Sequence, residues 1–453
     1  MTRNKYFRMN KYFILLVVWA IALPAFSQNM PARGSSVLTP ANGTTPGSSV
    51  FTPGNIAPSP GDGNGLEFYL QQALQNSPLL KDYQNQVQSG QVDSQILRAG
   101  YRPQVNGSSI NTYAPTINGY GYDQAISNGG NFSTLVAVNQ TLIGHRRLDA
   151  QLETIRLQNL GISNTSKISE QDLKKSVTAQ YITTYGDRQQ WTFNREIYDL
   201  LQNEASLLKD LTEKNVYRQT DYLAFVVTVK QEALLLRQLE IQYQNDYGTL
   251  NYLCGIMDTA TADLQPPSIT LQPLPDISNS VFFHQYHIDS LKLRNSRSLI
   301  DFNYRPKASL YADGGYSSTL AYEAYKNFGV SFGIMLSVPI YDGHQRKLQY
   351  GKLDIAERTR AAYKDFFTRQ YDQQIAQLSR QLRATEELIG QIDEQVKYSE
   401  TLITVNGKLL QTGDAKIADY ILALSSYLNA KNLLTQNNIT RWQIINQINY
   451  WNR

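Results

Sequence analysis

Four histidines are the side chains in this sequence best suited to bind a metal ion. His284 and His287 are three residues apart, a spacing that places both rings on one face of a helix in a geometry that zinc accepts. No third ligand is evident near them, so we interpret both as surface or interface residues. His145 and His344 each follow a glycine after a strand-like segment, and we interpret them as residues at an interfacial strand end. The sequence therefore predicts no metal site and no cofactor.

Nucleophilic chemistry has no motif in the chain. Serine, aspartate and glutamate are plentiful, but no GxSxG turn and no phosphate-binding glycine loop occurs. The single cysteine, Cys254, cannot form an intrachain disulfide. Lysine and arginine number 42 against 38 aspartates and glutamates, without a basic block. We therefore expect neither an enzyme nor a partner for nucleic acid.

The N-terminus, residues 1–27, is predicted to be a secretory signal peptide. Lys5, Arg8 and Lys11 precede the apolar run FILLVVWAIALPAF, and the ending AFS places the cleavage after Ser27. A transmembrane anchor is the alternative, although a membrane-spanning helix needs about 20 apolar residues. Residues 28–65 are rich in Pro, Gly, Ser and Thr and are predicted to be a flexible leader. No later segment contains the about 18 consecutive apolar residues of a transmembrane helix, which leaves a soluble exported protein or a β-barrel.

The rest of the chain contains one unit twice. YRPQVNGS, which begins at Tyr101, returns as YRPKASLY at Tyr304, and LVAVNQTLIGHRRL returns as IMLSVPIYDGHQRKL. QTDYL and IADYI follow in the same order, with Asp221 and Asp419 at equivalent positions. The resulting boundaries are 66–264 for the first repeat, 265–280 for the linker and 281–453 for the second repeat.

Each repeat contains a pair of predicted strands. In VSFGIMLSV, Val330, Phe332, Ile334 and Leu336 alternate with small or polar residues and with Met335. A soluble sandwich has the same alternation, but strands of about ten residues with loose Gly/Asn/Ser/Tyr loops are typical of a membrane barrel. We predict that those four side chains face lipid and that six tyrosines near the strand ends lie at the membrane-water boundary: Tyr113, Tyr120, Tyr122, Tyr316, Tyr322 and Tyr325.

Each repeat also contains very long helices. No proline occurs between Thr116 and Gln265 or after Pro339, so about seventy residues from Arg146 and again from Arg346 can continue as helix. Shorter helices are expected to return from about Asp221 and Asp419. Residues at heptad spacing predict coiled-coil seams, formed in the second repeat by Tyr371, Ile375, Leu378, Leu382, Ile389, Ile392, Val396 and Ile403, and in the first by Val177, Trp191, Tyr198, Leu201, Ala205 and Leu208.

The order of these parts resembles the TolC-like outer-membrane efflux proteins, the outer-membrane factors. LSVPIYDGHQRK at the strand-to-helix junction and TGDAKIADYILALSSYLNAKNLL at 412–434 are similar to the repeated landmarks of that family. The resemblance covers nearly all of the chain after Leu66. Its departures are Thr141 in place of a proline, the pairs Gly144-His145 and Gly343-His344 in place of a glycine pair, and no junction aspartate in the first copy.

The resemblance implies a mixed fold with helices and a β-barrel. Three copies would each give four strands to one barrel in the outer membrane of a Gram-negative bacterium, and long antiparallel helices to a periplasmic α-barrel. It implies a passive exit channel of an efflux or type I secretion system, with a periplasmic adaptor and an inner-membrane transporter as partners and outer-membrane lipid around the barrel. A structural periplasmic or cell-surface coiled-coil protein without channel activity is the alternative.

The resemblance also implies site residues. Thr220, Asp221 and Asp419 match the positions that narrow the pore in the family, and the two aspartates also fit the simpler role of stabilising a helix N-terminus. Leu410 and Ala415 stand where the family can place a tyrosine and an arginine that hold the mouth closed, which leaves Lys408 or Lys416 for that role. We expect the adaptor to contact the helix tips at Asn215, Gly413 and Asp414.

Overall fold

The computed structural model describes residues 65–115, 117–121, 130–142, 144–258, 260–273, 280–319 and 323–452. The chain divides into two units, residues 1–59 and 60–453, and all the described residues belong to the second unit. The predicted signal peptide, the predicted leader up to residue 64, Tyr122 and Tyr322 lie outside the described residues.

The elements of the second unit follow the same order twice. The first half contains α1 (Leu66–Asn76), α2 (Pro78–Gly100), β1 (Gln104–Tyr113), β2 (Gly130–Leu142), α3 (His145–Glu213) and α4 (Gln219–Cys254). The second half contains α5 (Val281–Asn303), β3 (Lys307–Ser318), β4 (Phe328–Ser337), α6 (Gln345–Thr412) and α7 (Ile417–Trp451). The predicted strands and long helices are confirmed, and the return helices α4 and α7 begin two residues earlier than expected. The separate helix α1 was not predicted.

Two helix starts are capped by a serine side chain. The Ser77 hydroxyl accepts a hydrogen bond from the Leu80 N–H at 3.4 Å, and Pro78 is the first residue of α2. Ser280 accepts a bond from the Phe282 N–H at 3.3 Å at the start of α5. These two helices lead directly into β1 and β3.

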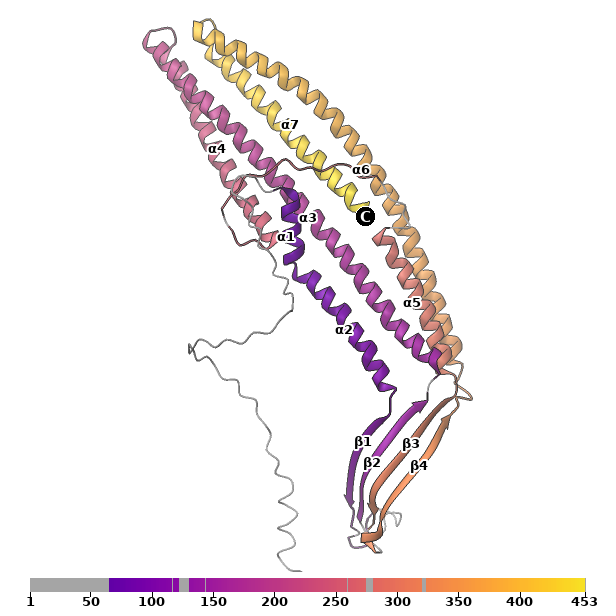
Figure 1. Ribbon diagram of the computed structural model, residues 1–453. Helices are drawn as coiled ribbons and strands as arrows, with labels where there is room; N and C mark the ends of the chain where they lie inside the picture. The colour runs from indigo at the N-terminus through magenta and orange to yellow at the C-terminus, as the bar shows by residue number, and fades with distance from the viewer. Residues whose placement is uncertain are drawn as a thin grey trace, which may run out of the picture. The chain divides into compact units, whose positions relative to one another are not determined.

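The four strands form one antiparallel sheet in the order β1-β2-β3-β4 (Figure 1). β2 and β3 come from different halves of the chain, and they pair from Phe132 opposite Ser318 to Leu142 opposite Ala308. Backbone hydrogen bonds therefore join the two repeats within the sheet.

The long helices form two antiparallel hairpins. α3 pairs with α4 and α6 pairs with α7, while α3 also packs against α7, so the four helices lie in the order α4, α3, α7, α6 (Figure 1). With 69 residues, α3 is roughly 100 Å long. No helix among the described residues combines the length and the apolar character needed to cross a membrane.

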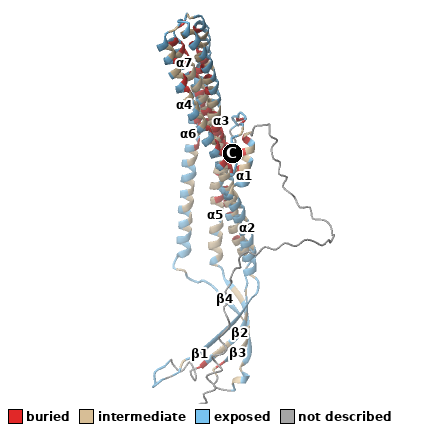
Figure 2. Cartoon of the chain, turned by 90° about the vertical axis from the view of Figure 1, so that its left-hand side faces the viewer, coloured by how far each residue is buried: buried red, intermediate tan, exposed pale blue. Residues whose placement is uncertain are grey.

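The predicted seam of α6 is confirmed. Its side chains are buried at Tyr371, Ile375, Leu378, Leu382, Ile392 and Val396, and half-buried at Ile389 and Ile403. Thr385 and Ser399 occupy buried seam positions between them. Figure 2 shows that the buried side chains are concentrated in the part of the helices toward the hairpin tips.

The predicted seam of α3 is partly wrong. Val177, Leu201 and Leu208 are fully buried, as expected, but Trp191, Tyr198 and Ala205 are only half-buried. Ile197 and Asn194 are buried instead. The reason is that α3 packs against several helices, so that more than one of its faces is covered and a single heptad line does not describe its core.

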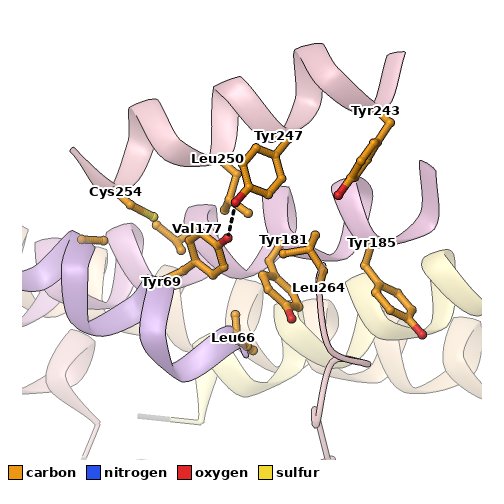
Figure 3. Close-up of a cluster of buried hydrophobic side chains, with 11 residues drawn as sticks. Leu66, Tyr69, Val177, Tyr181, Tyr185, Tyr243, Tyr247, Leu250, Cys254 and Leu264 are labelled. Atoms are coloured by element: carbon orange, nitrogen blue, oxygen red, sulfur yellow. Dashed lines mark hydrogen bonds between the residues drawn. The ribbon is translucent and has the colours of Figure 1, made fainter. Parts of the chain in front are cut away.

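A cluster of tyrosines forms the core where α1 meets the α3–α4 hairpin (Figure 3). The hydroxyls of Tyr69 in α1 and Tyr247 in α4 are 3.1 Å apart and share a hydrogen bond. Tyr181 in α3 donates to the Gln265 carbonyl at 2.6 Å, and Tyr243 in α4 donates to the Ala262 carbonyl at 3.0 Å. Each ring is therefore buried with its polar tip satisfied.

The segment between the repeats is fixed to the helices along its described part. Tyr181 of α3 donates to the Gln265 carbonyl at 2.6 Å, and Arg188 of α3 donates to the carbonyl of Leu264, just before the linker, at 2.8 Å. On the other hairpin, Asn449 of α7 donates to the Thr270 carbonyl at 2.8 Å, and Asn452 donates to the Gln272 carbonyl at 2.8 Å. The predicted linker thus bridges the two hairpins.

Candidate functional site

The sheet has one mainly apolar face across β4, β3 and the part of β2 that pairs with them. In β4, Phe328, Val330, Phe332, Ile334 and Leu336 lie on one face, and Leu310 of β3 pairs with Ile334 on the same side. Val136 and Val138 of β2 continue this face, because β2 pairs Val136 with Gly314 and Val138 with Ala312. All five β4 side chains are exposed in the single chain. The alternation predicted for Val330, Phe332, Ile334 and Leu336 is present, while contact with lipid stays a prediction.

The opposite face carries the charges of the sheet. Lys307 and Asp313, both in β3, are the only charged residues in the four strands, and their partners are Ser337 and Ser331 of β4. The Ser331 hydroxyl donates to a carboxylate oxygen of Asp313 at 2.6 Å. A carboxylate near the middle of the polar face is compatible with water on that side.

The two edges of the sheet are open within the part of the chain that the structure describes. β1 pairs only with β2, and β4 pairs only with β3. Each edge strand therefore leaves a row of backbone N–H and C=O groups without a partner from the sheet. Such edges are usually covered or paired with another strand.

The junction between β4 and α6 is held by Asp342. Its carboxylate accepts hydrogen bonds from the His344 N–H at 2.9 Å and the Arg346 N–H at 2.8 Å, and His344 has a positive φ of 66°. The Arg346 guanidinium binds Asp301 of α5, which also accepts from Tyr350. The hydrogen bond from Tyr350, and after it the bond from Arg346, lower the pKa of Asp301 below its usual range. The junction is thus held by Asp342 and by side chains of α5 and α6.

The histidines are not gathered into one site. His284 and His287 have ring centroids 6.0 Å apart on α5, and His344 lies beside Tyr341. Within the described ranges, no three side chains among His, Cys, Asp and Glu come close enough to hold a metal ion.

The two helix tips are built alike. Asn215 after α3 and Gly413 after α6 have φ values of 60° and 83°, as their residue types allow. In both turns the next N–H returns to a helix carbonyl at 2.9 Å, from Val216 to Leu211 and from Asp414 to Leu409. Asp414 is exposed and accepts a bond from the Thr412 hydroxyl at 2.7 Å. The predicted positions of both turns are confirmed, and adaptor docking there stays a prediction.

The two tips also touch one another. The Tyr217 hydroxyl lies 2.9 Å from the Leu410 carbonyl oxygen and 3.0 Å from that of Ala415, so its single proton serves one carbonyl at a time. A Cβ on Gly413 would come within 2.9 Å of Val216 Cγ1. The residues suggested for holding the mouth closed, Lys408 and Lys416, make no ion pair with the described part of the chain. Within the single chain Tyr217 joins the two tips, and a role of either lysine in holding the mouth closed stays a prediction.

The proposed constriction residues lie in the first turns of α4 and α7. Thr220 and Asp419 are exposed and Asp221 is half-buried. Neither helix has a side-chain N-cap bond, so neither aspartate is used as a cap acceptor. The rings of Phe225 and Tyr420, one turn or less further along each helix, are 6.1 Å apart. The structure therefore brings the starts of α4 and α7 together in one chain.

Sequence reasoning missed three features, one at the helix tips, one in the sheet and one between α3 and α4. Tyr217 occupies the position where the second repeat has Ala415. The available signal for a contact at this turn was an aromatic residue present in only one of the two copies. Asp313 was visible as the one acid within a strand pattern. A third feature, the pairing of Asp187 with Asp246 between α3 and α4, had no signal in the sequence.

Comparisons with known proteins agree with this geometry. No family model and no curated protein sequence matches the chain. Among solved structures, CusC, which forms a transmembrane channel, is 13% identical with a TM-score of 0.69, covering 85% of this chain and 91% of CusC. The outer membrane protein VceC of Vibrio cholerae is 13% identical with a TM-score of 0.67, covering 85% of this chain and 96% of VceC. The outer membrane channel CmeC of Campylobacter jejuni is 12% identical with a TM-score of 0.67, covering 85% of both chains.

At these identities the likeness shows the fold. The chain has the fold of the TolC-like outer-membrane channels, with a four-stranded sheet, two long helical hairpins and an internal repeat. The predicted fold class is confirmed.

Proposed function

We propose that this chain forms a passive exit channel in the outer membrane of a Gram-negative bacterium. The observation that carries the proposal is the two-faced sheet with open edges. Its strands have 10, 13, 12 and 10 residues, which suits a bilayer crossing by tilted strands of about 9–11 residues. An exposed row of large apolar side chains on one face and an acid on the other fit lipid outside and water inside.

Open edges cannot lie in hydrocarbon, because unpaired backbone groups have no water there. Pairing β4 of one copy with β1 of the next removes both edges. Three copies would close twelve strands, an even number within the range of such barrels. The homotrimer is also the assembly that the family resemblance in the sequence implies.

The helices would extend from this barrel into the periplasm. Because α3 is roughly 100 Å long, the helix tips lie far from the sheet. A conduit without a nucleotide-binding motif takes its energy from elsewhere, so we infer an inner-membrane transporter and a periplasmic adaptor that contacts the tips at Asn215, Gly413 and Asp414. Asp221, Asp419 and Thr220 would narrow the pore at this end.

Membrane fractionation tests the channel against the structural coiled-coil alternative. The channel should be extracted by detergent from the outer membrane and should migrate as a heat-sensitive trimer on a gel. Recovery of a monomer in the soluble periplasmic fraction would refute the proposal.

Adaptor docking needs a tip substitution that leaves the fold intact. Gly413 is unsuitable, because a side chain there meets Val216 and requires a positive φ. Asp414→Arg changes an exposed charge whose side chain binds only Thr412 among the described residues, and it should abolish export while the trimer stays in the membrane. Asn215→Gly keeps the backbone conformation of the other tip and removes a second side chain of the proposed docking surface, so a loss of export there with the trimer intact would assign docking to that side chain and not to turn geometry. Loss of the trimer in Asp414→Arg would assign the residue to folding and not to docking.

A further inference from the structure

The four junctions between helices and strands carry a belt of positive charge at one end of the sheet. These junctions are residues 98–104, 144–149, 301–307 and 338–347. Each holds two cations, which are Arg98 and Arg102, Arg146 and Arg147, Arg305 and Lys307, and Arg346 and Lys347. Against these eight cations the junctions contain three acids, Asp149, Asp301 and Asp342. Apart from Arg346, none of the cations forms an ion pair with a described residue, so the described chain leaves the belt largely unneutralised.

The opposite end of the sheet has no such excess of charge in its described part. Its described charged residues are Glu323 and Lys326, which pair with each other at 2.6 Å. This asymmetry matters because the proposed channel places the sheet in a bilayer, where cations at the membrane surface are attracted to anionic lipid headgroups. The helix end of the sheet is therefore the end that suits a layer of lipid phosphates.

The junction between β4 and α6 forms an open pocket of about 730 Å³ within this belt. Its lining includes Ile340, Arg346 and Lys347. Ile340 is 95% exposed. Together with Val338 it repeats, beyond the end of β4, the two-residue spacing of the apolar row that includes Leu336. The pocket thus begins where the apolar row of β4 ends, and it combines apolar with cationic groups.

Both cations of the pocket keep donors for a ligand. Arg346 donates from Nε to the Tyr350 hydroxyl at 3.1 Å and from Nη2 to Asp301, while its Nη1 forms no hydrogen bond with the described residues. Lys347 is exposed and has neither an ion pair nor a hydrogen bond with a described residue. A guanidinium nitrogen and an ammonium group on neighbouring residues are suited to bind the oxygens of one phosphate.

The acids that line the pocket already have partners in the chain. Asp342 accepts hydrogen bonds from two backbone N–H groups, and Asp354 lies 3.6 Å from Arg297. Tyr304 also lines the pocket, with its ring 5.7 Å from the Arg346 guanidinium. Aromatic rings with a polar tip are favoured at the boundary between membrane and water. The lining therefore suits a ligand that has both a phosphate and an apolar tail.

On the basis of the proposed channel function, we propose that this pocket binds the headgroup of an anionic phospholipid from the membrane leaflet on the helix side. Arg346 and Lys347 bind its phosphate, and an acyl chain follows Ile340 toward the apolar row of β4. The continuity of the pocket with that row favours a lipid over free inorganic phosphate. In the proposed barrel, β1 of the next copy pairs with β4, so that Arg98 and Arg102 of that copy add positive charge beside the pocket.

Native mass spectrometry of the detergent-extracted protein tests the site. Phosphatidylglycerol and phosphatidylcholine with identical acyl chains are titrated separately, and the lipid bound per chain is measured. Phosphatidylglycerol should bind several-fold more tightly and saturate one site per chain. Lys347→Gln should lower its affinity about fivefold, the effect of one cation at a membrane surface, and reduce the preference over phosphatidylcholine. Lys352→Gln removes an exposed lysine of the same helix that does not line the pocket, and should change neither affinity.

Ile340→Ser separates a bound lipid from a bound phosphate ion. The substitution removes an apolar contact with the acyl chain, so the affinities for both phospholipids should fall severalfold while the preference between them remains. A large excess of inorganic phosphate should leave phosphatidylglycerol bound to the native chain, because the ion supplies no apolar contact.

Three results would overturn the inference while the channel stands. They are equal affinities of the native chain for the two phospholipids, equal losses in Lys347→Gln and Lys352→Gln, and displacement of phosphatidylglycerol by inorganic phosphate, which would assign the pocket to the free ion. Conductance of the same preparation in a planar bilayer separates the two proposals. A native chain without conductance would refute the proposed channel and, with it, the lipid site.

Discussion

The two faces of β4 can be separated by one pair of neighbouring substitutions. Ile334 and Met335 are adjacent, apolar and exposed in the single chain, at 72% and 62%, but their side chains lie on opposite faces of the sheet. Ile334→Arg and Met335→Arg therefore introduce the same charge at the same height in place of similar side chains. The pair isolates the effect of the face.

Ile334→Arg should destabilise the inserted barrel. An arginine on the lipid face near the middle of the membrane costs about 2–4 kcal/mol in each chain, and about three times that in a trimer. Met335→Arg should cost much less, because on the polar face its charge stays in water, on the same side as Asp313. The assay is refolding into lipid vesicles with a urea titration, followed by heat-sensitive migration of the trimer.

The comparison has a clear refuting result. Equal losses of stability in Ile334→Arg and Met335→Arg would show that the two faces meet the same environment. The assignment of Val330, Phe332, Ile334 and Leu336 to lipid would then be wrong, whatever the cause of the loss. A conductance change in Met335→Arg alone would support the lumen-facing assignment.

Three further predictions concern the helices. Burial, and then the hydrogen bond and charge of Asp246, raise the pKa of Asp187 to about 8. Between the ordinary carboxyl pKa and about 8, the folded chain keeps a proton on Asp187 that the unfolded chain loses, so the free energy of unfolding falls as pH rises. Asp187→Asn cannot lose a proton, so in urea titrations it should raise the free energy of unfolding by at least about 1 kcal/mol at pH 8 and leave it unchanged at pH 4. Gly186→Val should destabilise the packing of α3 on α7 by about 1–3 kcal/mol, because a Cβ there would lie 2.1 Å from Ile439 Cδ1, and an unchanged melting temperature would contradict this close approach. Asp419→Asn should reduce cation preference and divalent block in a planar bilayer with the trimer unchanged, whereas unaltered selectivity with a weaker trimer would leave only a stabilising role at the helix N-terminus.

Local patterns in the sequence predicted much of the fold. The helix starting at Pro78 and the turns at Asn215 and Gly413 depend on residue types that act through their own backbone, so they could be placed to within a few residues. The strands and the seam of α6 follow simple periods of two and seven residues. These features need no knowledge of distant contacts.

Features that depend on several helices could not be predicted in this way. The α3 core shifts from Trp191 and Tyr198 to Asn194 and Ile197 because other helices cover additional faces of α3. Tyr217 joins the two tips only because the repeats fold against each other, which no single repeat reveals. The roles of Asp221 and Asp419 came from the resemblance alone and depend on further copies of the chain.

Conductance of the purified protein in a planar bilayer is the most direct test of the central claim that the chain forms a channel. Protein extracted from the outer membrane with detergent should produce uniform conductance steps, because each inserted trimer provides one water-filled path between sheet faces of defined polarity. Folded protein that shows intact helices by circular dichroism yet inserts without any conductance would contradict the claim.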